Sequence, residues 1–136
     1  MGISRMKPFL AIAATALLSA GTAYADCSYP PAPDHLPDGN TATLQEMVEG
    51  QKAVKDYDKA INAYVACIQL ESKDAIGKVA KPGEKPTADQ KKAMADMERV
   101  EVQKHNAAID QLQSVADRFN EQVKVYKAKN ADKQKG

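Results

Sequence analysis

The sequence predicts an all-α protein: an elongated antiparallel hairpin of two long amphipathic helices, with an extended proline-rich N-terminal arm linked to the first helix by a disulfide. Three observations lead to this prediction. Two stretches carry apolar residues three and four positions apart, a short proline-containing loop separates them, and only two cysteines occur. With 136 residues, the chain allows one small domain and excludes a two-domain enzyme with a cofactor fold.

Residues 1–25 have the pattern of a cleaved secretion signal. Two basic residues precede an apolar run over residues 8–18, and Ala23-Tyr24-Ala25 provides the small residues of a cleavage site. A retained membrane anchor is the alternative, but the run of roughly 11 residues is shorter than the ~20 that span a bilayer. We therefore expect a mature chain that begins at Asp26 and is periplasmic or secreted.

Without this signal, the chain carries 17 basic and 18 acidic side chains, a formal charge of −1. This balance excludes a polycation built to hold nucleic acid. A local excess of positive charge lies at the C-terminus and consists of Lys124, Lys127, Lys129, Lys133 and Lys135. These cations complement the negative end of a helix, and a weak contact with an anionic envelope surface is the alternative.

Cys27 and Cys67 form one even pair, which predicts a disulfide in an exported protein. A bond between two chains is the alternative to a bond within one chain. Cys67 lies about 36 Å into the first predicted helix, and Cys27 lies 16 residues before its start. The two meet only if the arm folds back at Pro37-Asp38-Gly39 and runs antiparallel along the helix. Tyr29 and Leu36 then lie on the helix.

The arm is expected over residues 26–42, because four prolines and a Pro-Asp-Gly turn signal exclude helix there. Thr43 and Glu46 form a capping box that begins the first helix, which we expect to continue to about Val79. The apolar stripe of this helix repeats at heptad spacing and consists of Met47, Gly50, Val54, Tyr57, Ile61, Tyr64 and Ile68.

A loop at about residues 80–86 reverses the chain, and Thr87 and Gln90 form a second capping box. The hairpin is expected to cover residues 43–129, followed by a frayed basic tail at 130–136. The apolar stripe of the second helix is Ile109, Leu112, Ala116, Phe119, Val123 and Tyr126. The step of eleven residues from Met94 to His105 predicts a stutter in its first half.

Two helices alone leave much of each apolar stripe exposed. We expect the arm, a break in one helix or a second chain to cover the remainder. A four-helix homodimer is the simplest form of the last solution.

The sequence contains no nucleophile motif, no Cys-x-x-Cys site and no phosphate-binding glycine loop. We therefore expect neither catalysis nor a cofactor. Two sets of residues suggest a small-ligand or metal-binding periplasmic protein as the alternative: His105 with Met94 and Met97, and Asp34 with His35 and Asp38. Each set also has a simpler interpretation, as helix packing and as a proline turn, respectively.

The arm and the first helix share a pattern that consists of Cys27, Leu36-Pro37-Asp38-Gly39, Met47, Val54, Tyr57, Tyr64 and Cys67. This pattern resembles one in small secreted proteins of Gram-negative bacteria and spans about a third of the chain. The resemblance implies export and a disulfide, and it brings no activity or binding residue. We hypothesise a non-enzymatic exported helical protein that presents a helical surface to a protein partner or to itself.

Overall fold

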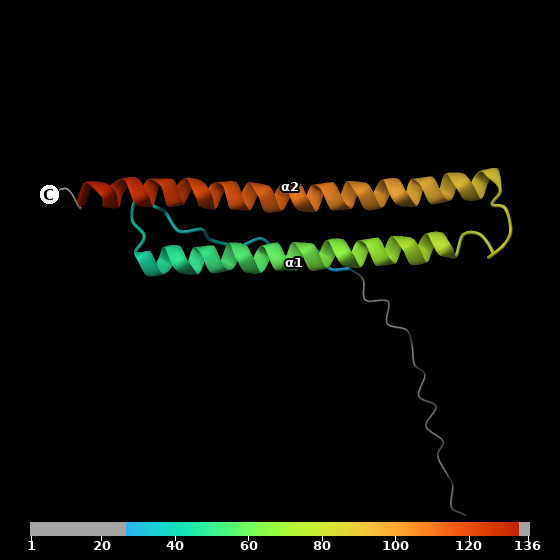
Figure 1. Cartoon of the computed structure of the whole chain (residues 1–136), viewed down its shortest axis with the longest axis horizontal. Helices are drawn as coiled ribbons and strands as arrows, with labels where there is room; N and C mark the ends of the chain where they lie inside the picture. Colours follow the sequence, from blue (N-terminus) through green and yellow to red (C-terminus); the bar gives the residue numbers. More distant parts are fainter. Residues whose placement is uncertain (1–26, 134–136) are drawn as a thin grey trace, which may run out of the picture.

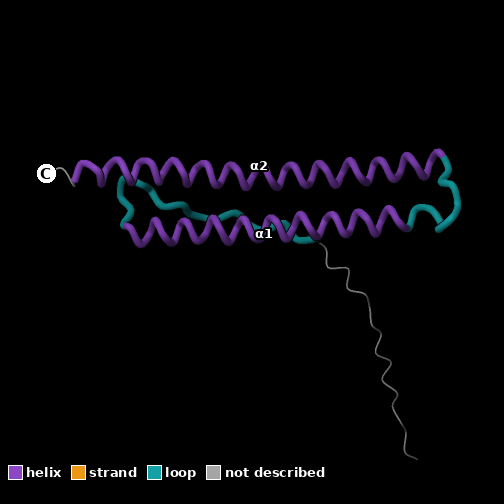
Figure 2. Tube along the Cα trace, in the orientation of Figure 1, coloured by secondary structure: helices purple, strands orange, loops and turns teal. Residues whose placement is uncertain are grey.

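The computed structural model describes residues 27–133, which form two α-helices and the loops before and between them. α1 comprises Leu44–Gly77 and α2 comprises Ala88–Lys133. The helices lie side by side and antiparallel along one long axis (Figure 1). Figure 2 shows the arm as a loop that runs back along the helices. The elongated hairpin is therefore confirmed. The predicted signal at 1–25 and the last residues of the predicted tail lie outside the described residues.

α1 begins at the predicted capping box. The Thr43 hydroxyl accepts a hydrogen bond from the Glu46 amide at 3.2 Å, and the Thr43 amide donates to the Glu46 carboxylate at 2.6 Å. This second hydrogen bond holds the pKa of Glu46 below its ordinary value. The helix ends at Gly77, two residues before the expected Val79, because glycine weakens a helix and the next two amides bond carbonyls only three residues back.

α2 begins at the second predicted capping box. The Thr87 amide donates to the Gln90 side chain at 2.8 Å, and the Gln90 amide donates to the Thr87 hydroxyl at 3.2 Å. The helix is continuous, so the predicted stutter does not interrupt it. It extends to Lys133, four residues beyond the expected end at 129, because alanine and lysine favour helix and no glycine or proline occurs before the last residue.

The buried residues of α1 follow the predicted stripe, whereas those of α2 are displaced from it at two positions. The deepest side chains of the core are Met47, Tyr57, Ile61, Ile68, Ala108, Val115 and Phe119. Ala108 and Val115 are buried, while the predicted Ile109 and Ala116 are half-buried. Ala108 and Val115 lie closer than the predicted residues to the side of α2 that faces the arm. The arm packs against that side and covers it, so the buried face of α2 includes it.

The arm is joined to α1 near the middle of the hairpin. The disulfide between Cys27 and Cys67 is present, with the two Cα atoms 5.7 Å apart. The Tyr29 ring meets the Tyr64 ring edge to face, with centroids 5.0 Å apart. Ala32 packs against the core formed by both helices. The predicted intrachain disulfide and the antiparallel course of the arm are therefore confirmed.

The arm reverses at the predicted Pro-Asp-Gly signal. The Asp38 carbonyl accepts hydrogen bonds from the two amides at Thr41 and Ala42, at 3.1 and 2.8 Å. The Gly39 amide donates to the Gln122 side chain at 2.9 Å, which holds the turn against α2. The arm thus contacts both helices along its length, and its two fixed points are the disulfide to α1 and the hydrogen bond from Gly39 to α2.

Replacing both cysteines by serine is expected to lower the free energy of unfolding by about 3 to 4 kcal/mol. This is the value of the chain-entropy model for a loop closed across a separation of 40 residues. Urea denaturation followed by far-ultraviolet circular dichroism measures the change. Wild-type protein in a reducing agent is the control and should lose the same amount. Unchanged midpoints in both samples would contradict the prediction.

Gly39→Ala is expected to cost about 1 to 3 kcal/mol of stability, because the new methyl group has no space. A Cβ at Gly39 would lie 2.8 Å from the Tyr126 backbone nitrogen and 2.9 Å from the Val125 Cβ. Gly77→Ala is the matched control, since a Cβ there meets nothing within 4 Å, and it should leave stability unchanged or raise it by up to about 1 kcal/mol. Equal effects of the two substitutions on the urea midpoint would show that the turn is not closely packed.

Candidate functional site

The candidate site is the groove between α1 and α2 on the side where the arm lies. The arm fills the half of this groove that runs from the disulfide to the open end of the hairpin. There residues 29–32 line a hollow together with Tyr57 of α1 and with Ala107 and Gln111 of α2. This half is therefore an intramolecular complex of an extended segment with a helical groove.

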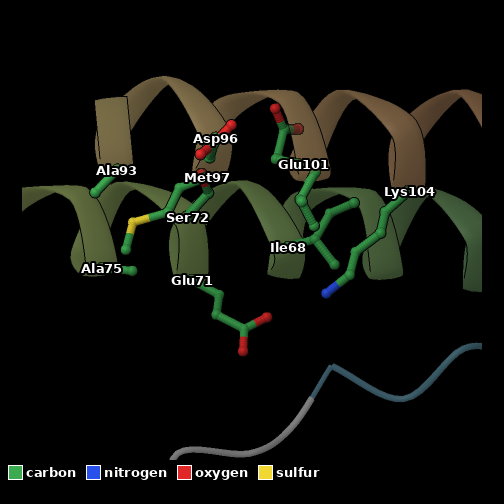
Figure 3. A pocket seen from close by; sticks show the side chains of 10 residues that line it. Ile68, Glu71, Ser72, Ala75, Ala93, Asp96, Met97, Glu101 and Lys104 are labelled. Atoms are coloured by element: carbon green, nitrogen blue, oxygen red, sulfur yellow. The ribbon is translucent and has the colours of Figure 1, made fainter. Parts of the chain in front are cut away.

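Beyond the disulfide, toward the hairpin loop, the groove is open. A hollow of about 480 Å³ lies there between the helices (Figure 3). We call it the tip groove and define it by the residues of its floor, which are Ile68, Ser72 and Ala75 of α1 and Ala93, Met97 and Val100 of α2. Its size and apolar floor are those of a small binding site.

The tip groove continues the groove that the arm fills. On α1, Glu71 follows Cys67 by four residues, and on α2, Lys104 precedes Ala107 by three. Residues three or four apart lie on the same face of a helix, so both lining faces pass uninterrupted from one half to the other. The two halves differ in the presence of the arm and not in the orientation of the helices.

Charged side chains form the rim of the tip groove. Asp96 accepts hydrogen bonds from Lys92 at 2.8 Å and Arg99 at 3.2 Å, and these bonds hold the pKa of its carboxyl below the ordinary value. Glu71 and Glu101 form no ion pair with a described residue. With Lys104 as the one cation that lines the hollow, the rim is acidic.

The structure does not bring His105, Met94 and Met97 together. Met94 and His105 are eleven residues apart in a continuous helix, which separates them by about 16 Å along its axis. Met97 lines the tip groove, whereas the His105 ring lies beside the Asn106 side chain, with Nδ1 and Oδ1 3.2 Å apart. Within residues 27–133, no three His, Cys, Asp or Glu side chains lie close enough together to hold a metal ion.

The second predicted set, Asp34, His35 and Asp38, lines one side of a hollow between the arm and α2. The Asp38 carboxylate accepts hydrogen bonds from the amide and the side chain of Asn40, at 2.9 and 3.2 Å. Asp38 therefore stabilises the turn of the arm, as the simpler interpretation of this set predicts.

The C-terminal lysines do not form one charged face. The Lys124 ammonium lies 2.7 Å from the Glu121 carboxylate, and this hydrogen bond raises the pKa of Lys124. Lys129 donates to the Asn40 carbonyl of the arm. The two lysines are five residues apart, which is about 140° around the helix. Lys127 is exposed. The side chains of Lys133 and Lys135 lie outside the part of the chain that the structure describes.

The buried hydroxyl of Tyr57 is a polar feature that the sequence pattern does not reveal. Tyr57 is 4% exposed, and its hydroxyl makes no hydrogen bond of good geometry to a described residue. Burial, together with a smaller effect of the neighbouring Tyr29, raises the pKa of Tyr57 to about 12. Heptad spacing predicts that Tyr57 faces the core, but only the position of the arm determines what its hydroxyl meets.

Comparisons of this chain with protein-family models, curated proteins and solved structures find no match. Over residues 27–133, neither helix contains a window that is long and apolar enough to cross a membrane. The function is therefore inferred from the residues and geometry of the groove.

Stability is expected to fall as the pH rises from about 10 toward 12, because the unfolded chain ionises Tyr57 before the folded chain does. At about pH 11 this contributes a loss of about 1 kcal/mol. Tyr57→Phe removes the titrating group. Between about pH 10 and about pH 11, the free energy of unfolding of the variant should therefore fall by about 1 kcal/mol less than that of the wild type. The measurement is the urea midpoint of each protein at several pH values in this range. If the midpoints of the two proteins change with pH in parallel, the prediction is wrong.

Proposed function

We propose that this protein is a non-enzymatic exported module of the bacterial envelope that binds a protein partner through the groove between its helices. The observation that carries the proposal is the tip groove, an apolar hollow between the two helices that the arm does not cover. Apolar floors with polar rims are the common form of protein interaction sites.

Two features support export. The N-terminal residues have the pattern of a secretion signal, and Cys27 and Cys67 lie at bonding geometry. Structural disulfides persist in oxidising compartments such as the periplasm and the cell exterior. The periplasmic or secreted location and the disulfide therefore belong to the same proposal.

The rigidity of the scaffold supports binding. Both helices begin at a capping box, the arm joins them on one side, and the buried Ile68 forms part of the floor of the groove. A preformed site needs little ordering when a partner binds, so less of the binding free energy is lost.

A second copy is the alternative partner. Leu44 and Val48 are exposed beside Val123 near the open end of the hairpin, on a surface that does not include the arm. An isologous contact of this surface would form a homodimer. A contact of the C-terminal lysines with anionic envelope polymers would add little and would weaken with salt.

Photo-crosslinking in living cells of the producing bacterium tests the proposed function. A photoreactive residue replaces Val100 in the tip groove, Leu44 at the open end, or Lys59 on the exposed face of α1. We expect one discrete adduct with another protein, found in the envelope or the medium, from the Val100 position, whereas the Leu44 position tests the alternative partner. Because Lys59 lies away from both apolar surfaces, it is the control and should give none.

Three results would overturn the proposal: recovery of the chain in the cytoplasm with free thiols, absence of any adduct, or equal labelling from all three positions. An adduct that consists of two copies of the chain would identify the homodimer instead.

A further inference from the structure

We propose that the tip groove binds an extended, proline-containing segment of another protein, with Lys or Arg next to its prolines. This inference rests on the proposed function and adds the chemistry of the partner to it. Three observations carry it: the arm bound in the same groove, the dimensions of the open half, and the charge of its rim.

The arm shows which kind of segment this groove accommodates. Residues 29–33 form an extended segment without regular secondary structure, and three of the five are prolines. Tyr29 packs against Tyr64, and Ala32 reaches the core between the helices. Proline-rich segments are already extended before they bind, so they lose little conformational entropy in a groove of this kind.

The open half has the dimensions of a second segment of this type. From Cys67 to Gly77, α1 rises about 15 Å, and an extended proline-rich chain covers that length with about five residues. Small side chains on both helices, Ala75 and Ala93, leave space for the backbone of the segment, and Val100 offers an apolar contact. The lining faces are those that already hold the arm on the other side of the disulfide.

The rim determines the charge of the segment. Glu71 and Glu101 come from facing helices and form no ion pair with a described residue, whereas Asp96 is neutralised by its two basic neighbours. Two carboxylates against the single cation Lys104 leave the edge of the apolar hollow with a net negative charge, which favours a segment with cations next to its apolar residues.

A second copy of the chain does not offer such a segment. Its own proline-rich arm is held by the disulfide at Cys67 and by the hydrogen bond from Gly39 to Gln122. The arm would have to leave its own groove before it entered that of a neighbour. The tip groove is therefore assigned to a different protein.

A synthetic peptide tests this inference on the mature, disulfide-bonded chain. The probe carries the sequence of residues 28–33 between two lysines and a fluorescent label, and its anisotropy is measured as protein is added. We expect saturable binding with a Kd below about 1 mM. Val100→Lys should raise the Kd at least about tenfold, because it places a cation on the apolar floor.

Val102→Lys is the matched control. Val100 and Val102 are 42% and 50% exposed, so neither substitution disturbs the core, and Val102 does not line the tip groove. The control should leave the Kd within about twofold of the wild-type value. A second peptide with glutamates in place of the lysines should bind at least about fivefold more weakly, and Glu71→Gln with Glu101→Gln should reduce this difference.

The inference is overturned by the absence of saturable binding at about 1 mM protein, or by equal losses in the two valine variants. Sedimentation equilibrium provides a further check: a wild-type dimer that Val100→Lys dissociates would assign the groove to a second copy. In the cellular experiment, an adduct of another protein at the Val100 position, together with no saturable binding of the peptide, would leave the proposed function intact and overturn this inference.

Discussion

The structure depends on the covalent attachment of the arm to α1. Two helices in a single layer share only one narrow contact, and the described chain offers a core of just a few large side chains. The bond between Cys27 and Cys67 makes the arm a third packing element, because it lowers the chain entropy of the unfolded state and so reduces the cost of placing the arm beside the helices. The edge contact of Tyr29 and the burial of Ala32 follow from this attachment.

The position of the arm also divides the groove into two parts. Where the arm lies, the core includes Tyr57, Ala108 and Val115, and the buried face of α2 is turned toward the arm. Beyond the disulfide, the same two helices leave an apolar hollow with an acidic rim. One continuous surface is thus divided into two halves: the arm covers the first, and the second, which the arm leaves uncovered, is where we propose that a partner binds.

Local signals in the sequence were sufficient for most of the fold. The two capping boxes, the Pro-Asp-Gly turn and the heptad spacing of α1 each act within a few residues, and the pair of cysteines restricts the arm to one course. Features that depend on how the arm packs against the helices were not predictable from such local signals. The buried positions of α2 shift toward the arm, the Tyr57 hydroxyl is enclosed, and Lys129 binds the turn. The tip groove was not predicted because a hollow depends on where the arm ends, which periodicity does not describe.

The two anchors of the arm lie on different helices: Cys27 is bonded to α1, and Gly39 is hydrogen-bonded to α2. An antiparallel pair with heptad-like stripes can exchange its pairing by sliding one helix a whole heptad, about 10 Å, past the other. Such a slide would stretch or slacken the arm by the same length and remove one anchor. The arm therefore sets the axial register of the two helices, a property that their own repetitive apolar faces leave ambiguous.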